Sequence, residues 1–404
     1  MSTKKVRSLS RVYDAVLRTH LRRHRQMAFV SGPRQVGKTT TCRAQSAAYL
    51  SWDDDSDRRL ILMGPTAVAR HLGLEVLREQ PLVCCFDELH KNPRWKGFLK
   101  GLFDTWGERG RFIVTGSSRL DLYRRGGDSL MGRYLLYRMH PLSVGELVRH
   151  TAPKRLVERP RRLVERSWAA LLEHGGYPEP FLKRDRGFSH QWRRLRSAQL
   201  LREDIRELTR IHELAQLEHM GLLLAERSAT SLVLSNLATD VQVSVDTARR
   251  WVEALASLHF GFLVRPYFRN VAKALRKEPK WYLRDWSGCV DPGARAETLV
   301  ACHLLKAVEV WQDLGLGDFE LRYLRDKQKR EVDFLVVRDR KPWFLVEVKQ
   351  GDASLSPSLA YFQRETGAAH AFQVVVDLAY VDADCFSRHE PVAVPARTFL
   401  SQLP

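Results

Sequence analysis

The 404-residue sequence lacks the features of membrane-spanning and disulfide-bonded proteins. It contains no run of about 18 apolar residues, which a membrane-spanning helix requires. The basic segment MSTKKVRSLSRVYDAV is not followed by the apolar stretch of a signal peptide. There are six cysteines but no CxxC pair, and their spacing suits neither a disulfide framework nor a zinc site. We therefore expect a cytoplasmic protein with reduced thiols.

Acidic residues are too few to balance the basic ones. The chain has 47 Asp and Glu against 66 Lys and Arg, which gives a net charge of +19. Such a positive field attracts polyanions and speeds their encounter. Nucleic acid is the first candidate partner and an anionic membrane is the second. A basic surface without such a partner is the remaining alternative.

The first 150 residues alternate between short apolar runs and helical segments. Strands are expected at residues 26–31, 82–86 and 111–115, and residues 134–139 can add a further one. An amphipathic helix is expected before the first strand, with its inward face formed by Val12, Val16 and Leu17. This alternation predicts an α/β fold with a parallel sheet flanked by helices.

The segment GPRQVGKTT matches the GxxxxGK[ST] motif. It follows an apolar strand and opens a helix, which is the context that this motif requires. In such a loop, backbone N–H groups face the phosphates, Lys38 reaches the β- and γ-phosphates, and the Thr39 hydroxyl binds Mg²⁺. We therefore expect ATP and Mg²⁺ as cofactors. The nucleotide-binding loop is predicted to consist of Gly32, Pro33, Arg34, Gln35, Val36, Gly37, Lys38, Thr39 and Thr40.

About fifty residues downstream, the apolar run LVCCF ends in Asp87 and Glu88. Asp87 is expected to hold Mg²⁺ through water, and Glu88 to orient or deprotonate the attacking water. An Asp-Glu pair after a strand is common in proteins. It becomes a specific signal because it follows a P-loop at this distance.

Two further positions are candidates for the same site. The strand at 111–115 ends in TGSSRLD, where Ser117 or Ser118 can sense the γ-phosphate or cap a helix. An arginine from the same or a neighbouring subunit would stabilise charge in the transition state. Arg133 is the first candidate for that catalytic role and Arg119 the second, although either can be a surface arginine.

The chain resembles a prokaryotic family that joins an AAA-type ATPase domain to a C-terminal domain of unknown function. The resemblance rests on the P-loop and on the segments YLSWDDDSDR, FDELHKNPRWKGFLKGLFD and VTGSSRLDLYRRGGDSLMGRYLLYRMHPLSVGEL. It covers nearly the whole chain. It implies an ATPase of the additional-strand class with Walker residues at Lys38, Thr39, Asp87 and Glu88. Rings are common in that class, so a homo-oligomer is expected by analogy.

The segment SLVLSNLATDVQVSVDTARRWVEALASLHFGFLVRPY resembles a winged helix. We expect one helix with Leu234 and Leu237 inward, a second helix capped by Ser244, and then a wing strand. The buried side of the second helix is predicted to carry Val245, Ala248, Trp251, Val252 and Leu255. Arg249 and Arg250 would lie on its exposed face, where they can contact DNA. The alternative is a packing module within a larger ATPase.

The segment REVDFLVVRDRKPWFLVEVKQ carries Asp333 on one strand and Glu347 and Lys349 on the next. Residues two apart on a strand face the same side, so Glu347 and Lys349 can share a site. With Glu297 on an upstream helix, this E…D…ExK series resembles the PD-(D/E)XK, restriction-endonuclease-like fold. Glu297, Asp333 and Glu347 are predicted to hold Mg²⁺, with Lys349 neutralising the reacting phosphate. The domain can also bind DNA without cleaving it.

Four domains are therefore expected in this α/β protein. They are an AAA-type P-loop ATPase domain at 1–150, a helical basic segment at 151–229, a winged helix-turn-helix at 230–285 and a restriction-endonuclease-like domain at 286–404. The predicted function is ATP hydrolysis coupled to an action on DNA, with possible metal-dependent cleavage. The alternatives are a DNA motor or remodeller whose C-terminal domain only grips, and a regulatory switch ATPase with protein partners.

Overall fold

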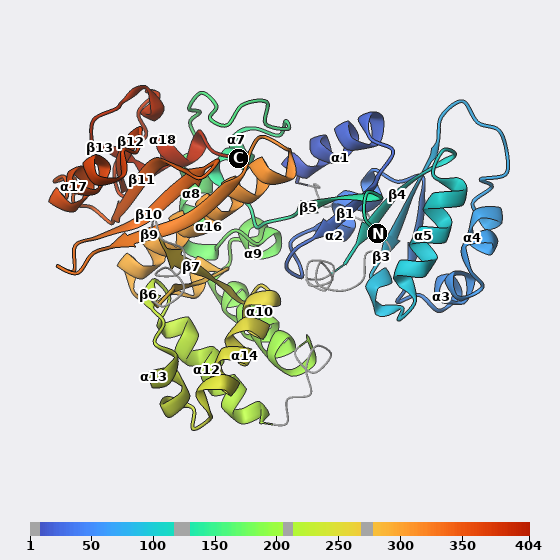
Figure 1. Cartoon of the computed structure of the whole chain (residues 1–404), viewed down its shortest axis with the longest axis horizontal. Helices are drawn as coiled ribbons and strands as arrows, with labels where there is room; N and C mark the ends of the chain where they lie inside the picture. The colour runs from blue at the N-terminus through green and yellow to red at the C-terminus, as the bar shows by residue number, and fades with distance from the viewer. Residues whose placement is uncertain (1–8, 117–129, 205–212, 268–277) are drawn as a thin grey trace. The chain divides into compact units, whose positions relative to one another are not determined.

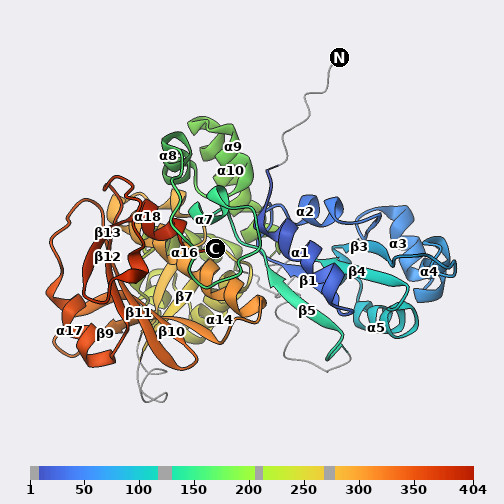
Figure 2. The ribbon, with the colours of Figure 1, turned by 90° about the horizontal axis from the view of Figure 1, so that it is seen from above.

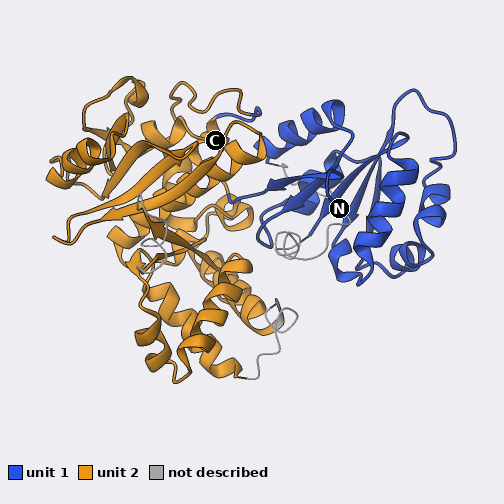
Figure 3. Cartoon of the chain, in the orientation of Figure 1, with its two compact units in different colours: residues 1–141, 149–152 blue, residues 142–148, 153–404 orange. Residues whose placement is uncertain are grey.

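The computed structural model describes residues 9–116, 130–204, 213–267 and 278–404 (Figure 1). The chain divides into two compact units, one formed by residues 1–141 with 149–152 and the other by 142–148 with 153–404 (Figure 3). Within the described parts of the chain, no helix combines the length and the apolar character needed to cross a membrane.

The first unit is built on a five-stranded, all-parallel sheet in the order β2-β3-β4-β1-β5. The predicted parallel α/β architecture is confirmed. β4 lies between the P-loop strand β1 and the acidic strand β3, which is the additional-strand arrangement. The strands are β1 (Met27–Ser31), β2 (Ala48–Ser51), β3 (Leu82–Asp87), β4 (Gly110–Thr115) and β5 (Tyr134–Arg138).

Helices cover both faces of this sheet, because its central strands are apolar on both sides. Figure 2 shows α1 and α2 on one face and α5 on the other. Phe29, Phe86 and Phe112 pack toward α5 in one continuous core. The helices of this unit are α1 (Val12–Arg23), α2 (Lys38–Ala44), α3 (Asp55–Leu62), α4 (Pro65–His71), the 3₁₀ turn η1 (Leu89–Lys91) and α5 (Trp95–Trp106).

The second unit contains an eight-stranded mixed sheet in the order β13-β12-β11-β10-β9-β7-β8-β6. β9, β10 and β11 are antiparallel, whereas β11, β12 and β13 are parallel. The strands are β6 (Thr230–Ser231), β7 (Gly261–Pro266), β8 (Lys280–Leu283), β9 (Phe319–Arg325), β10 (Glu331–Arg338), β11 (Lys341–Lys349), β12 (His370–Val375) and β13 (Val392–Pro395).

The long helix α16 (Pro292–Asp313) packs along this sheet. It begins at a strong start signal: Asp291 accepts a hydrogen bond from the backbone of Ala294, and Pro292 is the first helical residue. Its inward face is apolar over nearly its whole length, which fixes it against β8, β9, β10 and β11. The helix α17 (Pro357–Thr366) packs on β10, β11 and β12.

The remaining helices of this unit precede the sheet, connect its strands or follow its last strand. The segment from α8 to η3 is rich in arginine, as its sequence indicates. These elements are α7 (Val144–Val148), α8 (Glu165–His174), α9 (Pro178–Lys183), α10 (Arg186–Gln199), the π-helix η3 (Leu200–Asp204), α12 (Leu214–Glu226), α13 (Leu234–Asp240), α14 (Val245–Ser257), the 3₁₀ turns η4 (Trp286–Gly288) and η5 (Cys385–Ser387), and α18 (Ala396–Ser401).

The middle of the chain has the element order α12, β6, α13, α14, β7, β8. Ser244 caps α14 as expected, because its side chain accepts a hydrogen bond from the backbone N–H of Thr247. The prediction for Val245 is wrong: its side chain is 40% exposed, since the buried face of α14 begins one turn later at Ala248. β7 pairs with β8 on one side and with β9 on the other, so a single sheet continues beyond residue 285.

Candidate functional site

The P-loop occupies the turn between β1 and α2. Gly32 has a φ of +140°, and a Cβ there would lie 2.2 Å from the carbonyl oxygen of Met139, so only glycine fits. Lys38, the first residue of α2, is buried, and its Nζ donates hydrogen bonds of 2.8 Å to the carbonyls of Gly32 and Pro33. Burial lowers the pKa of Lys38 to about 8, while Glu88 and Asp87 oppose this shift. The remaining loop residues Arg34, Gln35, Val36, Thr39 and Thr40 lie in the same turn.

Asp87 is the polar centre of this site. The carboxyl ends of parallel strands meet at one edge of a sheet, and this brings β2, β3 and β4 to the start of α2. Asp87 Oδ2 accepts hydrogen bonds from the Thr39 hydroxyl at 2.9 Å and from the Tyr49 hydroxyl at 2.6 Å. Its Oδ1 accepts one from the hydroxyl of Thr115. Tyr49 and Thr115 lie within segments that carry the family resemblance, but the sequence pattern assigned neither of them a role at this site.

Glu88 follows Asp87 in the left-handed backbone region, with a φ of 54°. This uncommon conformation turns its side chain away from the strand direction. Burial raises the pKa of Glu88, although Lys38 and Lys91 act in the opposite direction. Its Oε2 lies 3.8 Å from Nζ of Lys91. The structure therefore brings Lys38, Thr39, Asp87 and Glu88 together as the sequence predicts.

Arg11 is hydrogen-bonded to the backbone of the P-loop. The sequence did not indicate this role. The guanidinium group of Arg11 donates hydrogen bonds to the carbonyl of Val36, at 2.5 Å, and to the carbonyl of His140, at 2.7 Å. The side chain is only 3% exposed. It joins the loop to the segment that follows β5. The only signal in the sequence was an arginine at the predicted start of an apolar helix.

The structure describes only one of the residues predicted to sense the γ-phosphate or to supply the catalytic arginine. Ser117, Ser118 and Arg119 lie outside the described residues. Arg133 lies at the start of β5, where its carbonyl accepts a hydrogen bond from the backbone of Met27. The P-loop follows the opposite end of β1, roughly 16 Å away at about 3.3 Å per residue.

Arg133 also forms an ion pair with Asp104 of α5, at 2.7 Å from Nε to Oδ1. The structure therefore does not bring Arg133 to the P-loop of its own chain, and the prediction that it completes this site within one subunit is wrong. The reason is topological, because strand direction fixes which end of β5 faces the loop. A role in a neighbouring subunit stays a prediction.

The donor set beside the P-loop suits a hard divalent cation. Mg²⁺ takes few protein ligands and keeps water and phosphate oxygens in its shell. Thr39 and Asp87 supply a hydroxyl and a carboxylate that already lie within hydrogen-bonding distance of one another. These residues fit Mg²⁺ bound together with a nucleotide.

The second predicted cluster lies where α16 meets β8, β10 and β11. Its members are Glu297, Asp333, Glu347 and Lys349, and the structure brings them together as expected. An unpredicted residue, Lys280, lies among them. Its Nζ is 3.0 Å from Glu297, 2.6 Å from Glu331 and 3.2 Å from Asp333, measured to carboxylate oxygens.

Lys280 is buried at the start of β8, and its side chain is 5% exposed. Burial alone would lower the pKa of this ammonium, but the carboxylates of Asp333, Glu297 and Glu331 raise it above its usual value. Burial of a charge costs free energy unless a partner compensates it. The ammonium of Lys280 is therefore the internal counterion of three carboxylates.

Glu347 and Lys349 form the outer part of this cluster. Nζ of Lys349 lies 2.9 Å from Oε1 of Glu347, and Oε2 of Glu347 is buried without a hydrogen-bond partner among the described residues. Burial raises the pKa of Glu347 to about 7, and the nearby carboxylate of Asp333 adds to the shift. The pKa of Glu297 is raised to about 7 for the same two reasons. Asp333 Oδ2 accepts a hydrogen bond of 2.9 Å from the backbone of Val348.

This cluster does not fit the predicted Mg²⁺. In the described parts of the chain, no group of three or more His, Cys, Asp or Glu side chains is placed to hold a metal ion. The ammonium of Lys280 contacts two of the three predicted metal ligands, Glu297 and Asp333. A cation bound between them would be repelled by this buried positive charge.

Arg249 and Arg250 lie on the exposed face of α14, as expected. Arg249 forms an ion pair with Asp246 at 2.6 Å, and Arg250 donates to the hydroxyl of Thr247 at 3.2 Å. Both partners belong to the first turn of the same helix. Exposed ion pairs such as that of Arg249 with Asp246 contribute little to stability.

Three family models match the chain in succession. Residues 24–148 match a model described as an AAA domain. Residues 165–289 match a domain of unknown function, DUF8612, and residues 292–389 match another, DUF4143. The P-loop, Asp87 and Glu88 all fall within the AAA match.

Two curated relatives are 28% identical to the chain over 357 residues, which is 86% of this chain and 76% of each relative. They are the uncharacterized proteins Mb2031c of Mycobacterium bovis and Rv2008c of Mycobacterium tuberculosis. Their names give no activity.

Solved structures resemble the chain only distantly. The ORC1 protein of Aeropyrum pernix in complex with DNA is 12% identical with a TM-score of 0.30, covering 71% of this chain and 90% of that one. AMPPCP-bound DnaA from Aquifex aeolicus is 15% identical with a TM-score of 0.30, covering 59% and 86%. Likenesses this weak carry no argument about function. The family matches and the sheet order together show that the chain contains an AAA domain of the P-loop ATPase fold, followed by two domains of unknown function.

Proposed function

We propose that the protein binds and hydrolyses ATP and uses this cycle to act on DNA, which its C-terminal domain grips without cleaving. The observation that carries the ATPase part is the convergence of four side chains at one edge of the parallel sheet. Lys38 and Thr39 come from the P-loop, and Asp87 and Glu88 come from the end of β3. They have the residue types and the places that phosphoryl transfer to water requires.

Each of these groups has a distinct task. Lys38 exchanges its hydrogen bonds to the loop carbonyls of Gly32 and Pro33 for bonds to the β- and γ-phosphates. Thr39 and Asp87 hold Mg²⁺, which neutralises charge on the phosphate oxygens when it is bound. Glu88, whose carboxyl pKa is raised by burial, accepts the proton of the attacking water. Arg11 keeps the loop backbone in place through Val36.

Action on DNA is supported by charge and by the order of elements in the middle of the chain. The net charge of +19 favours encounter with a polyanion. Helix α12, strand β6, helices α13 and α14, and the strand pair β7 and β8 follow one another in the order of a winged helix. Its second helix, α14, carries the exposed Arg249 and Arg250, which suit contacts to phosphates.

Gripping without cleavage is supported by Lys280. A metal-dependent nuclease needs cations among its carboxylates, and the ammonium of Lys280 already neutralises Glu297, Glu331 and Asp333. Catalysis of strand cleavage by this cluster is therefore not part of the proposal. The restriction-endonuclease-like fold stays a proposal for this domain, supported by the helix and strands that bring Glu297, Asp333, Glu347 and Lys349 together.

One experiment tests the proposal. ATP turnover and strand cleavage are measured together on duplex, single-stranded and branched DNA, with Mg²⁺ present. We expect turnover that DNA stimulates and strands that stay intact. Cleavage that disappears in Asp333→Ala would overturn the gripping role. Turnover without any DNA binding would instead favour a regulatory switch ATPase that acts on protein partners.

A further inference from the structure

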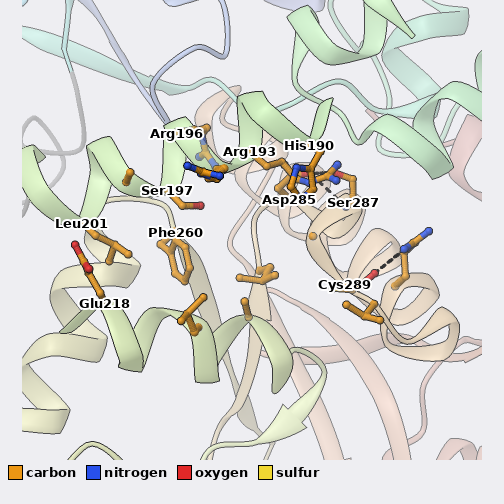
Figure 4. Close-up of a pocket in the computed structure, with 18 of the residues that line it drawn as sticks. His190, Arg193, Arg196, Ser197, Leu201, Glu218, Phe260, Asp285, Ser287 and Cys289 are labelled. Carbon is orange, nitrogen blue, oxygen red and sulfur yellow. Dashed lines mark hydrogen bonds between the residues drawn. The ribbon is translucent and has the colours of Figure 1, made fainter. Parts of the chain in front are cut away.

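A pocket of about 720 Å³ opens within the second unit, and its lining shares no residue with the carboxylate cluster (Figure 4). One wall is formed by α10 and η3, and a second by α12 together with Phe260. The third wall is the segment from the end of β8 through η4, which includes Asp285 and Cys289. The volume lies within the range of about 300–1,000 Å³ that is typical of small-ligand sites.

The pocket is strongly basic. Five arginines and two carboxylates line it, and they are Arg193, Arg194, Arg196, Arg202, Arg295, Glu218 and Asp285. Arg202 forms an ion pair with Glu218 at 2.6 Å. The other four arginines have no carboxylate partner within the described parts of the chain. This surplus of guanidinium groups is suited to an anion, and a phosphate can accept two bonds from one guanidinium.

Three of these arginines are held by neutral groups. Arg193 donates to the hydroxyl of Ser287 at 3.1 Å. Arg295 donates from Nε and from a terminal nitrogen to the carbonyl of Cys289, at 2.9 and 2.7 Å. The guanidinium of Arg196 donates a hydrogen bond to the hydroxyl of Tyr177 and lies 4.1 Å from the centre of that ring. These bonds orient the side chains and leave their positive charge uncompensated.

Two buried polar atoms of the lining lack partners among the described residues. They are Nε of Arg196 and Oδ2 of Asp285, and the two residues are only 8% and 7% exposed. The other carboxylate oxygen of Asp285 accepts hydrogen bonds from the backbone and hydroxyl of Ser287. A buried polar group without a partner costs about 1–3 kcal/mol.

The remaining lining is apolar and in part exposed. Val290 is 89% exposed and Leu222 is 65% exposed, while Phe260 and Leu201 form the deeper part of the wall. Exposed apolar side chains beside arginines without carboxylate partners indicate a ligand with an anionic end and an apolar face. The planar ring of a nucleobase supplies such an apolar face.

We propose that this pocket binds a nucleotide. The phosphate is recognised by Arg193, Arg194 and Arg295. The base lies on the apolar wall formed by Phe260, Leu201 and Leu222. The nucleotide can be free, or it can belong to a single strand of nucleic acid. In the second case the inference rests on the proposed action on DNA.

The test uses the full-length protein and two probes. A fluorescein-labelled strand of ten thymidines is titrated by fluorescence anisotropy. Free dTMP is titrated by calorimetry in the Lys38→Ala background, so that the P-loop does not contribute. The pocket variants are Val290→Glu, which adds a carboxylate at an exposed position, and the double variant Arg193→Gln with Arg194→Gln. The matched controls are Val381→Glu, at an exposed valine outside the pocket, and Arg186→Gln, at the exposed start of α10.

We expect the double arginine variant to weaken binding of the strand about tenfold or more, because one lost charge-assisted contact is worth roughly 1.4 kcal/mol or more. Val290→Glu should also weaken it, because the added carboxylate repels the phosphate. The logarithmic salt dependence should become shallower by about 0.7 for each phosphate contact removed. Both controls should bind as the wild type does. Loss of dTMP binding alone, with the strand unaffected, would assign the pocket to a free nucleotide and would still support the inference.

Two results would overturn the inference. The first is unchanged affinity of both pocket variants for both probes. The second comes from a titration with a ten-residue glutamate peptide. If Val290→Glu loses binding of this peptide while both nucleotide probes bind normally, the pocket belongs to an acidic peptide. Failure of the proposed function is seen separately, since it appears as absent ATP turnover or absent DNA binding in the wild type, and the dTMP titration still tests the pocket.

Discussion

The hydroxyl of Thr39 donates a hydrogen bond of 2.9 Å to Oδ2 of Asp87, although the two residues are far apart in the sequence. One lies at the start of α2 and the other at the end of β3. This contact joins the P-loop to the acidic strand. Although β4 lies between β1 and β3, all three strands are parallel, so their carboxyl ends lie at the same edge of the sheet. It places the residues to which we assign phosphate binding and Mg²⁺ binding side by side.

Replacement of Lys38 by alanine should abolish ATP hydrolysis. The ammonium is buried within the loop, and its three donors are the groups that the β- and γ-phosphates would accept from in place of the carbonyls of Gly32 and Pro33. Turnover is measured by phosphate release at saturating ATP. Lys100→Ala, at an exposed lysine of α5, should hydrolyse ATP at the wild-type rate. Unchanged turnover in Lys38→Ala would refute the nucleotide site.

Replacement of Glu88 by glutamine should separate binding from chemistry. Glutamine keeps the size of the side chain but cannot accept a proton, and a general base contributes about 10²–10⁴-fold to a rate. We expect turnover to fall by that factor while the affinity for a fluorescent ATP analogue changes little. A fall in affinity that accounts for the whole loss would show that Glu88 is needed to build the pocket rather than to activate water.

Replacement of Arg11 by lysine should weaken nucleotide binding about tenfold. A single ammonium cannot reproduce the planar pair of bonds to the carbonyls of Val36 and His140. A bond to a charged donor is worth about 1.5–3 kcal/mol, so thermal stability of the first unit should fall as well. Equilibrium binding of an ATP analogue checks the first effect. Arg18→Lys, on the exposed face of the same helix, is the control and should leave both quantities unchanged.

Replacement of Lys280 by methionine should destabilise the second unit by about 3–5 kcal/mol, because Glu297, Glu331 and Asp333 lose their counterion. Protonation relieves this repulsion, so the loss should shrink as the pH falls. Denaturant unfolding measures both effects. Mn²⁺ should raise the melting temperature of this variant but not that of the wild type. Lys341→Met, at an exposed lysine of β11, should behave as the wild type does; an equal response to Mn²⁺ in all three proteins would contradict the counterion role.

Acid should weaken the second unit through His303. Its Nε2 accepts a hydrogen bond of 3.1 Å from the backbone N–H of Val144, and its Nδ1 lies 2.8 Å from the carbonyl of Leu299, which requires the neutral ring. Burial lowers the pKa of His303 from 6.5 to about 4. The folded state therefore resists protonation, so stability is fully present above pH 6.5 and is lost as the pH falls toward 4.

The shift corresponds to about 3 kcal/mol, at 1.36 kcal/mol for each unit of pKa. Unfolding free energies of the wild type and of His303→Gln are compared between pH 7 and pH 4. We expect the variant to be less stable at pH 7 and its pH dependence to be smaller by that amount. His219→Gln, at an exposed histidine of α12, should keep the wild-type slope. Parallel curves for all three proteins would refute the linkage.

Local patterns in the sequence predicted the elements of the first unit well. The strand at residues 111–115 and the inward face of Val12, Val16 and Leu17 follow from apolar periodicity, which depends only on near neighbours in the chain. The cap of Ser244 follows from the same local chemistry. Val245 is the counterexample, because the helical period does not say at which turn burial begins.

Short motifs were enough to indicate that a P-loop follows a buried strand and that carboxylates gather in the C-terminal domain, because each motif lies within a few consecutive residues. The counterion of those carboxylates is apparent only from the fold. Lys280 precedes Asp333 by more than fifty residues and reaches it through the pairing of sheet strands and the packing of α16. The tertiary structure also decided the position of Arg133, because the direction of β5 sets which end meets the loop. Charge compensation acts through space at a few ångströms, so no local pattern along the chain records it.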